Sequence, residues 1–158
     1  IIAWDSDFRS TWTQLNSMNR GATRWNGRLD MAHTGFFGHS FGGAAALNVC
    51  AMQVECLAAA DLDGTLFGPV TAEPLQKPTL FLWSQNSADS AARKLFDSRP
   101  DQSVWKELPG VKHYNFTDMS LEFNPLLRAA GMLGSANPVD TLQTVRLTLR
   151  QFFDSHLR

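Results

Sequence analysis

Short apolar runs alternate along this chain with longer segments whose apolar residues recur at helical spacing. The runs that predict buried strands cover residues 33–37, 57–62, 79–83 and, more weakly, 103–108. The segments that predict helices cover residues 4–18, 41–53, 87–98 and a last one that opens at Asn137-Pro138. Because strands that alternate with helices are typical of a parallel sheet, we expect an α/β fold with about four mostly parallel strands and helices on both faces.

The size and composition of the chain are those of one folded domain. The chain has 158 residues, and we expect residues 1–158 to form a single domain. Hydrophobic residues make up 44% and charged residues 18%, which excludes a disordered chain. The formal net charge of -1 offers no basic field for nucleic acid. The longest nearly apolar stretch, 44–52, is too short to cross a bilayer, so we expect a soluble protein without a membrane span.

The start of the chain has the features of neither a natural N-terminus nor a signal peptide. It opens Ile-Ile-Ala-Trp, with no Met and with no charged region followed by an apolar one. We therefore expect an N-terminally incomplete domain that begins inside a larger one. Compartment and oligomeric state stay open at this stage.

Two cysteines, Cys50 and Cys56, leave two interpretations open. The favoured one is a pair of small buried apolar side chains without a covalent link. The alternative is a local disulfide that closes a helix-to-strand turn, and it would imply an oxidising compartment and a secreted protein.

The segment Gly38-His39-Ser40-Phe41-Gly42 fits the pattern Gly-x-Ser-x-Gly between a predicted strand and a predicted helix. The pattern places a serine on a turn so tight that we expect a Cβ at Gly38 or Gly42 to clash with neighbouring chain. The turn lifts the Ser40 hydroxyl clear of the sheet and brings the N–H groups of the next helix close to it. We therefore expect Ser40 to be a nucleophile and the Phe41 N–H to be an oxyanion donor. The His39 side chain is expected to point away from the Ser40 hydroxyl and to be structural.

A serine hydroxyl needs an imidazole to take its proton, and the imidazole needs an acid to orient it. His113 lies in a loop after the last predicted strand, where the chain order Ser, Asp, His that accompanies this motif places the base. Three carboxylates are candidates for the acid: Asp63 at a strand end, Asp61 two positions earlier, and Asp89 after the next strand. We favour Asp63 because it ends its strand beside a glycine, where ligand chemistry gathers in open α/β sheets.

Three groups of residues resemble a known family. The run Gly38 to Gly43, the pair Leu62-Asp63 and the run His113 to Asp118 are similar to the platelet-activating-factor acetylhydrolases of plasma and bacterial type, which are α/β-hydrolases. The resemblance extends to residues 27–30 and to the closing amphipathic helix. It implies that Ser40 is the nucleophile, Asp63 the acid and His113 the base. It also implies calcium-independent cleavage of short or oxidised acyl esters, often in phospholipids, with no metal or organic cofactor.

The resemblance also implies that this chain is the C-terminal half of such a domain. The first strands of the family, and the loop that gives the second oxyanion donor, should precede residue 1. The strand before Ser40, interior in the family, would then lie at an exposed apolar edge. Because the loss of one oxyanion donor typically costs on the order of 100- to 1000-fold in rate, we expect this chain alone to be poorly active.

A different reading starts from the segment Asp61-Leu62-Asp63-Gly64, which is also similar to the first motif of haloacid-dehalogenase-type phosphatases. In that family Asp61 would attack phosphorus, Asp63 would act as acid and base, and magnesium would bind both. Ser84 could supply the next motif, and Lys106 or Lys112 the required lysine. The late pair of metal-binding acids that this family needs is missing from residues 98–158.

A third hypothesis is a non-catalytic remnant that binds lipid or a partner protein through its five tryptophans, Trp4, Trp12, Trp25, Trp83 and Trp105. Tryptophans belong more often to cores and pocket walls. We therefore favour a serine carboxylic-ester hydrolase that acts through an acyl-enzyme on short-chain or phospholipid-type esters.

Overall fold

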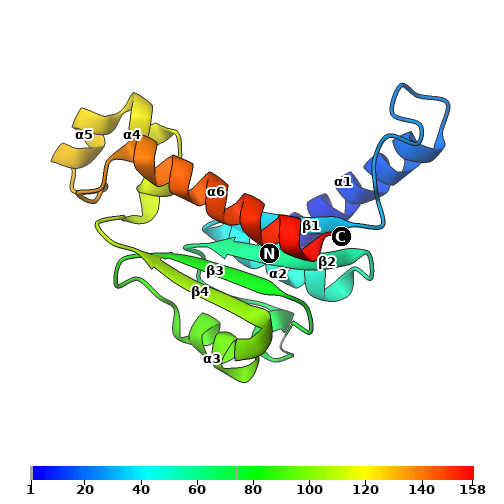
Figure 1. The fold of residues 1–158 in the computed structure, drawn as a ribbon, viewed down its shortest axis with the longest axis horizontal. Helices are drawn as coiled ribbons and strands as arrows, with labels where there is room; N and C mark the ends of the chain where they lie inside the picture. The colour runs from blue at the N-terminus through cyan, green and yellow to red at the C-terminus, as the bar shows by residue number, and fades with distance from the viewer. Residues whose placement is uncertain (1, 74) are drawn as a thin grey trace.

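The computed structural model describes residues 2–73 and 75–158, and its centre is a parallel β-sheet (Figure 1). In the described residues the sheet has four strands, β1 (Thr34–His39), β2 (Cys56–Leu62), β3 (Thr79–Ser84) and β4 (Ser103–Leu108), in the order β1-β2-β3-β4. The helices are α1 (Ile2–Arg20), α2 (Phe41–Met52), α3 (Ser90–Ser98), α4 (Met119–Glu122), α5 (Asn124–Ala129) and α6 (Pro138–His156). Short 3-10 helices cover Pro69–Thr71, Pro100–Gln102 and His113–Phe116. The predicted α/β fold with a parallel sheet is confirmed.

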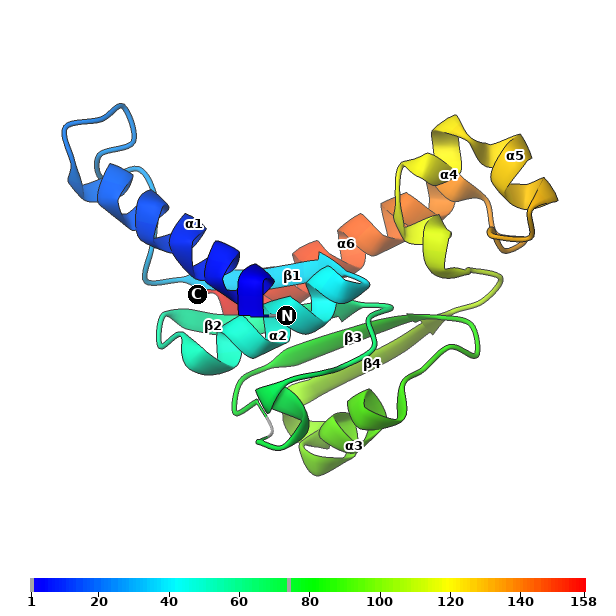
Figure 2. The same cartoon turned by 180° about the vertical axis from the view of Figure 1, so that it is seen from behind.

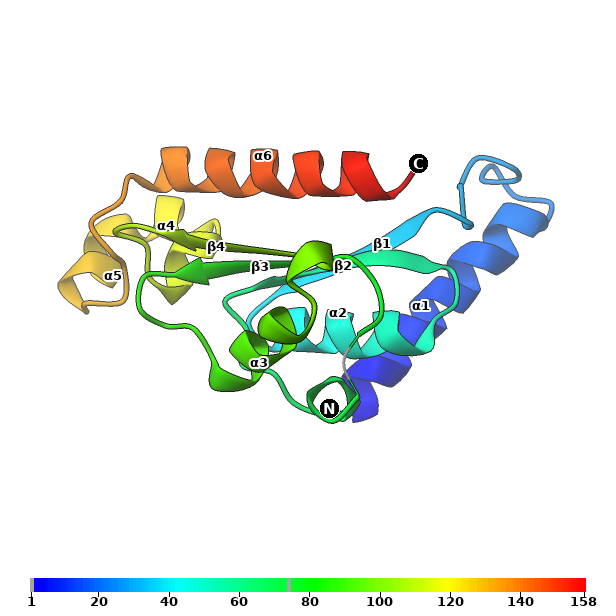
Figure 3. The same cartoon turned by 60° about the horizontal axis from the view of Figure 1, so that its bottom comes forward.

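Helices cover both faces of the sheet. Figure 3 shows α6 on one face and α1, α2 and α3 on the other. The side chains of β3 alternate accordingly: Leu80 and Leu82 belong to the clusters under α6, and Phe81 and Trp83 to the cluster under α2 and α3. Because both faces of the two central strands are buried, β2 and β3 consist of nearly continuous apolar runs. Within the described residues, no helix has a stretch long and apolar enough to span a bilayer.

β1, the strand before Ser40, lies at an edge of this sheet. One of its side chains, Phe37, remains 53% exposed, whereas Phe36 packs against Phe8 of α1 with ring centroids 5.8 Å apart. α1 also packs against α2 (Figure 2). The ring centroids of Trp4 in α1 and Phe41 in α2 lie 4.8 Å apart. The N-terminal helix therefore packs on the same side as the helix that follows the nucleophile candidate.

The favoured interpretation of the two cysteines was wrong, because Cys50 and Cys56 form a disulfide. The chain leaves α2 in a turn that brings their Cα atoms to 5.2 Å, a separation that a disulfide can bridge. The link joins the last turn of α2 to the first residue of β2. The ammonium of Lys77 donates to the carbonyls of Cys50 and Gln53 and so caps the same end of α2.

Candidate active site

Ser40 lies on the turn between β1 and α2 in a strained backbone conformation. Its φ is 58° and its ψ is -128°, a region that non-glycine residues rarely adopt. Its N–H donates to the carbonyl of Leu62 (2.8 Å), which fixes the turn to the end of β2. A Cβ at Gly38 would lie 2.3 Å from the backbone of Gly42, as predicted. The expectation for Gly42 was wrong, because a Cβ there would make only an ordinary contact of 3.6 Å with a tryptophan ring.

His113 and Asp63 form a direct pair at the carboxyl ends of the strands. The Nδ1 of His113 lies 2.8 Å from the Oδ2 of Asp63. Asp63 follows the last residue of β2, with a φ of 55°, and its side chain is buried. His113 begins the short 3-10 helix after β4. The loops after β2 and β4 therefore bring together two of the residues that the sequence singled out.

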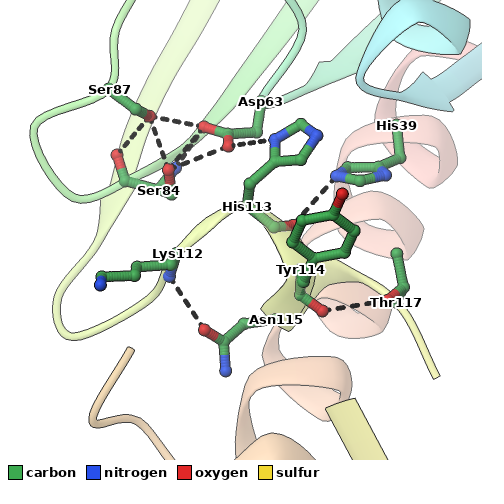
Figure 4. Close-up of polar contacts among 9 residues, drawn as sticks. All are labelled: His39, Asp63, Ser84, Ser87, Lys112, His113, Tyr114, Asn115 and Thr117. Atoms are coloured by element: carbon green, nitrogen blue, oxygen red, sulfur yellow. Dashed lines mark hydrogen bonds and ion pairs between the residues drawn. The ribbon is translucent and has the colours of Figure 1, made fainter. Parts of the chain in front are cut away.

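Asp63 accepts further hydrogen bonds from Ser84, the last residue of β3, and from Ser87 in the loop that follows (Figure 4). The Ser84 N–H donates to its Oδ1 (2.8 Å), and the hydroxyls of Ser84 and Ser87 lie 2.8 and 2.6 Å from the same oxygen. Burial by itself would raise the pKa of Asp63, but the hydrogen bonds from Ser87, from the Ser84 backbone, from His113 and from the Ser84 hydroxyl outweigh it, so this pKa lies below its ordinary value. Sequence reasoning did not find this role of Ser84 and Ser87.

Ser40, Asp63 and His113 line one cavity of about 630 Å³. The Ser40 hydroxyl and the His113 ring are not hydrogen-bonded to each other among the contacts of the described residues. Catalytic hydrogen bonds of this kind often tighten only when substrate is held. The remaining lining residues are Phe41, Thr65, Phe67, Trp83, Ser84, Gln85, Ser87, Lys112, Tyr114 and Met132. Four of them are aromatic, so the cavity has an apolar wall beside its polar groups.

Phe41, the expected oxyanion donor, is the first residue of α2. The N–H groups at the start of a helix have no acceptor inside that helix, so the Phe41 N–H can serve an anion. The side chain of Phe41 is held between two rings, with centroid distances of 4.8 Å to Trp4 and 4.5 Å to Phe67. This packing fixes the residue next to Ser40.

The other two candidate acids have different environments. Asp61 is fully buried, and its carboxyl lies so close to the backbone of Gly43 and Gly64 that a Cβ at either glycine would collide with it. Burial raises the pKa of Asp61 well above its ordinary value. Asp89 caps α3 by accepting from the N–H of Ala92 (3.2 Å). Neither carboxyl contacts His113.

The burial of Asp61 argues against the phosphatase hypothesis. Asp61 is not among the residues that line the cavity, from which it would have to attack phosphorus. Of the two lysines considered for that chemistry, Lys106 is not among the lining residues of the cavity and donates to Thr148 (3.1 Å), whereas Lys112 lines it and gives one ammonium hydrogen to the carbonyl of Gly131 (2.7 Å). Over residues 2–73 and 75–158, no three His, Cys, Asp or Glu side chains are grouped as a metal site would require.

Structural comparison finds esterase and hydrolase folds. A ferulic acid esterase from Streptomyces cinnamoneus has a TM-score of 0.76 and 28% identity; the match covers 99% of this chain and 48% of that protein. A dienelactone hydrolase-like promiscuous phosphotriesterase from metagenomic libraries has a TM-score of 0.66 and 15% identity; the match covers 100% of this chain and 66% of that protein. A third structure, called m3DLH, has a TM-score of 0.62 and 17% identity; the match covers 98% of this chain and 66% of that protein. The two matches of low identity show the fold alone.

A match to a family model shows the family to which this chain belongs. This chain spans about half the length of the ferulic acid esterase that it matches. A search of curated proteins found no match. The model of the family described as platelet-activating factor acetylhydrolase, isoform II, matches residues 14–158, and this is most of the chain. The chain is therefore a member of the platelet-activating factor acetylhydrolase, isoform II, family.

Proposed function

We propose that the protein is a serine carboxylic-ester hydrolase in which Ser40, His113 and Asp63 act as a catalytic triad. One observation carries the proposal: the imidazole of His113 is held by Asp63 at 2.8 Å in the cavity that Ser40 also lines. The strained turn at Ser40 and the family membership support it independently. The Asp63–His113 pair gives the imidazole the orientation that a general base requires.

The chemistry follows from these positions. The Oγ of Ser40 attacks the ester carbonyl carbon while its proton passes to the Nε2 of His113, and the Phe41 N–H donates to the oxyanion that forms. The C–O bond to the alcohol then breaks, and His113 returns the proton to the leaving alcohol. A water molecule attacks the acyl-enzyme, gives one proton to His113, and releases the acid as Ser40 recovers its hydrogen. Asp63 stabilises the imidazolium in both halves.

The walls of the cavity indicate the class of ester. Phe41, Phe67, Trp83 and Tyr114 offer an apolar surface, and Lys112 is the cation among the lining residues. We propose short-chain or phospholipid-type esters as substrates, since an apolar wall takes a short acyl chain and an ammonium can pair with a phosphate. The related ferulic acid esterase makes an aromatic acyl ester a second candidate, and the aromatic lining favours it too.

A fluorophosphonate probe tests the nucleophile directly, because it labels an activated serine even where turnover is slow. We expect labelling at Ser40, its loss in Ser40→Ala and His113→Ala, and no change in Ser10→Ala, which alters an exposed serine of α1. Hydrolysis of p-nitrophenyl acetate, a short-chain phospholipid and methyl ferulate then ranks the substrates. Phosphatase activity that requires magnesium and survives Ser40→Ala would contradict the proposal.

A further inference from the structure

His39, the residue immediately before Ser40, contacts the residue that we propose as the base. Its Nε2 lies 3.0 Å from the backbone carbonyl oxygen of His113. The two imidazole rings lie beside each other, with centroids 4.4 Å apart and planes inclined at 38°. The other neighbour of the His39 ring is Phe116, stacked at 5.8 Å and 24°. Figure 4 shows the His39 ring directed at the His113 backbone. The sequence predicts a structural His39, and the structure adds that its contacts include His113 and Phe116.

The carbonyl acceptor determines which nitrogen of the His39 ring carries the proton. A carbonyl oxygen can only accept, so the Nε2 of His39 must carry the proton in this contact. Burial, and after it the neighbouring His113 ring, lower the pKa of His39, although its hydrogen bond and the charge of Asp63 act in the opposite direction. A neutral ring with Nε2–H follows. A neutral neighbour does not oppose the positive charge that His113 acquires during acyl transfer.

We propose that His39 is a positioning residue that holds His113 at a fixed place relative to Ser40; this rests on the proposed triad. His39 and Ser40 are consecutive residues at the end of β1, whereas His113 follows β4. The hydrogen bond from His39 ties the backbone of the base to the residue next to the nucleophile. Asp63 fixes a second point of His113, its Nδ1. With one backbone atom and one ring atom held, the His113 ring has fewer orientations open to it, and its Nε2 is directed more narrowly.

Neighbouring contacts hold the rest of this segment but do not replace His39. The Oδ1 of Asn115 accepts from the N–H groups of Lys112 (2.9 Å) and Gly134 (2.8 Å), which ties the turn to the loop before α6. Of the contacts described, the one from His39 links the segment to the strand of the nucleophile.

The test compares two substitutions, one that keeps the ring of His39 and one that keeps a hydrogen-bond donor. His39→Phe keeps a planar ring for the stack on Phe116 but has no N–H, whereas His39→Gln loses the ring and keeps a donor of similar reach. The readout is inactivation by a fluorophosphonate, resolved into its maximal rate and its half-saturating concentration. We expect His39→Phe to lower the maximal rate about tenfold, since small displacements of a catalytic group are costly, with the half-saturating concentration within twofold of the native value. His39→Gln should keep most of the rate.

Each outcome decides the matter. Equal losses in His39→Phe and His39→Gln, or no loss in either, would overturn the positioning role. If His39→Phe does not fold, His39→Met provides the donor-free variant, and failure of both to fold would assign His39 to stability alone and reject the proposal. Ser40→Ala and His113→Ala separate the two proposals: if they leave labelling unchanged, the triad itself fails; if they abolish it while His39→Phe reacts like the native protein, only the role of His39 fails.

Discussion

Reduction of the Cys50–Cys56 disulfide removes a covalent link between the end of α2 and the start of β2. The resulting loss in the free energy of unfolding follows from the length of the loop that the disulfide closes. The two cysteines are separated by 6 positions in the sequence. For a loop this short, the chain-entropy relation gives a loss of about 2 kcal/mol in the free energy of unfolding. Both side chains are fully buried, so reduction leaves two thiols of nearly the same volume in the core. The packing contribution is therefore small, and the entropic one dominates.

Urea unfolding with and without reductant measures this loss. At a slope of about 2 kcal/mol per molar urea, we expect the midpoint to fall by about 1 M on reduction. The variant with both Cys50→Ala and Cys56→Ala is the control, because its midpoint should not respond to reductant. Labelling of Ser40 should change little, since Cys50 lies about 14 Å along the helix axis from Phe41. A midpoint shift below about 0.3 M, or two free thiols in the unreduced protein, would refute the reasoning.

Two further predictions concern the buried groups beneath Ser40. The raised pKa of Asp61 means that the folded protein keeps this proton at pH values above the unfolded pKa of about 3.9, so native stability falls as pH rises toward the folded pKa. Asp61→Asn has no such proton to lose, so in urea unfolding it should become progressively more stable relative to the native protein as pH is raised from about 4. A difference that does not vary with pH would contradict this. Gly43→Ala should destabilise by about 1–3 kcal/mol, because its Cβ would lie 1.9 Å from the Oδ1 of Asp61, whereas Gly42→Ala should change stability by less than about 0.5 kcal/mol. Equal effects of the two substitutions would show that the turn adapts.

The elements that the sequence predicts best are those with local signals. The run Thr79 to Trp83 predicts β3 because burial on both faces makes the strand uniformly apolar. Asn137 followed by Pro138 predicts the start of α6, and the Asn137 side chain accepts from the N–H of Val139 at 2.9 Å. In both cases the deciding interactions lie within a few residues of one another. The sequence alone is therefore enough to predict these two elements.

α4 and α5 were not predicted, and their interactions explain why. Each is too short to show an apolar periodicity over several turns. α5 is held instead by Arg128, whose guanidinium donates to the carbonyls of Gly134 (2.7 Å) and Ala136 (2.9 Å). These acceptors lie in the loop before α6, so the conformation depends on contacts that no local pattern records.

The candidate site was predicted in part for the same reason. Ser40 and Asp63 carry motif and strand-end signals, but Ser84 is one serine after an apolar strand. Its role depends on register: β3 lies between β2 and β4, so the end of β3 meets Asp63 on one side and Leu108 on the other. Strand order and register are properties of the whole sheet. Residues that hold the carboxylate of Asp63 in this way become visible only in the structure.

The order of the strands also explains why His113, the proposed base, must be held from several sides. Ser40 and Asp63 come directly after β1 and β2, Ser84 is the last residue of β3, and His113 lies in the segment after β4. At about 4.8 Å between neighbouring strands, β4 lies about 14 Å from β1, farther than a histidine side chain can reach. The segment after β4 must therefore run back across the carboxyl ends of β3 and β2 toward Ser40. A segment that crosses a sheet edge has no ladder to fix it, so its position depends on its other hydrogen bonds. At His113 these are the bond from its ring to Asp63 and the bond from His39 to its backbone, whereas Gln85 and Gly134 hold the segment at Val111 and Asn115. Weakening either contact at His113 should displace the base before it unfolds the sheet.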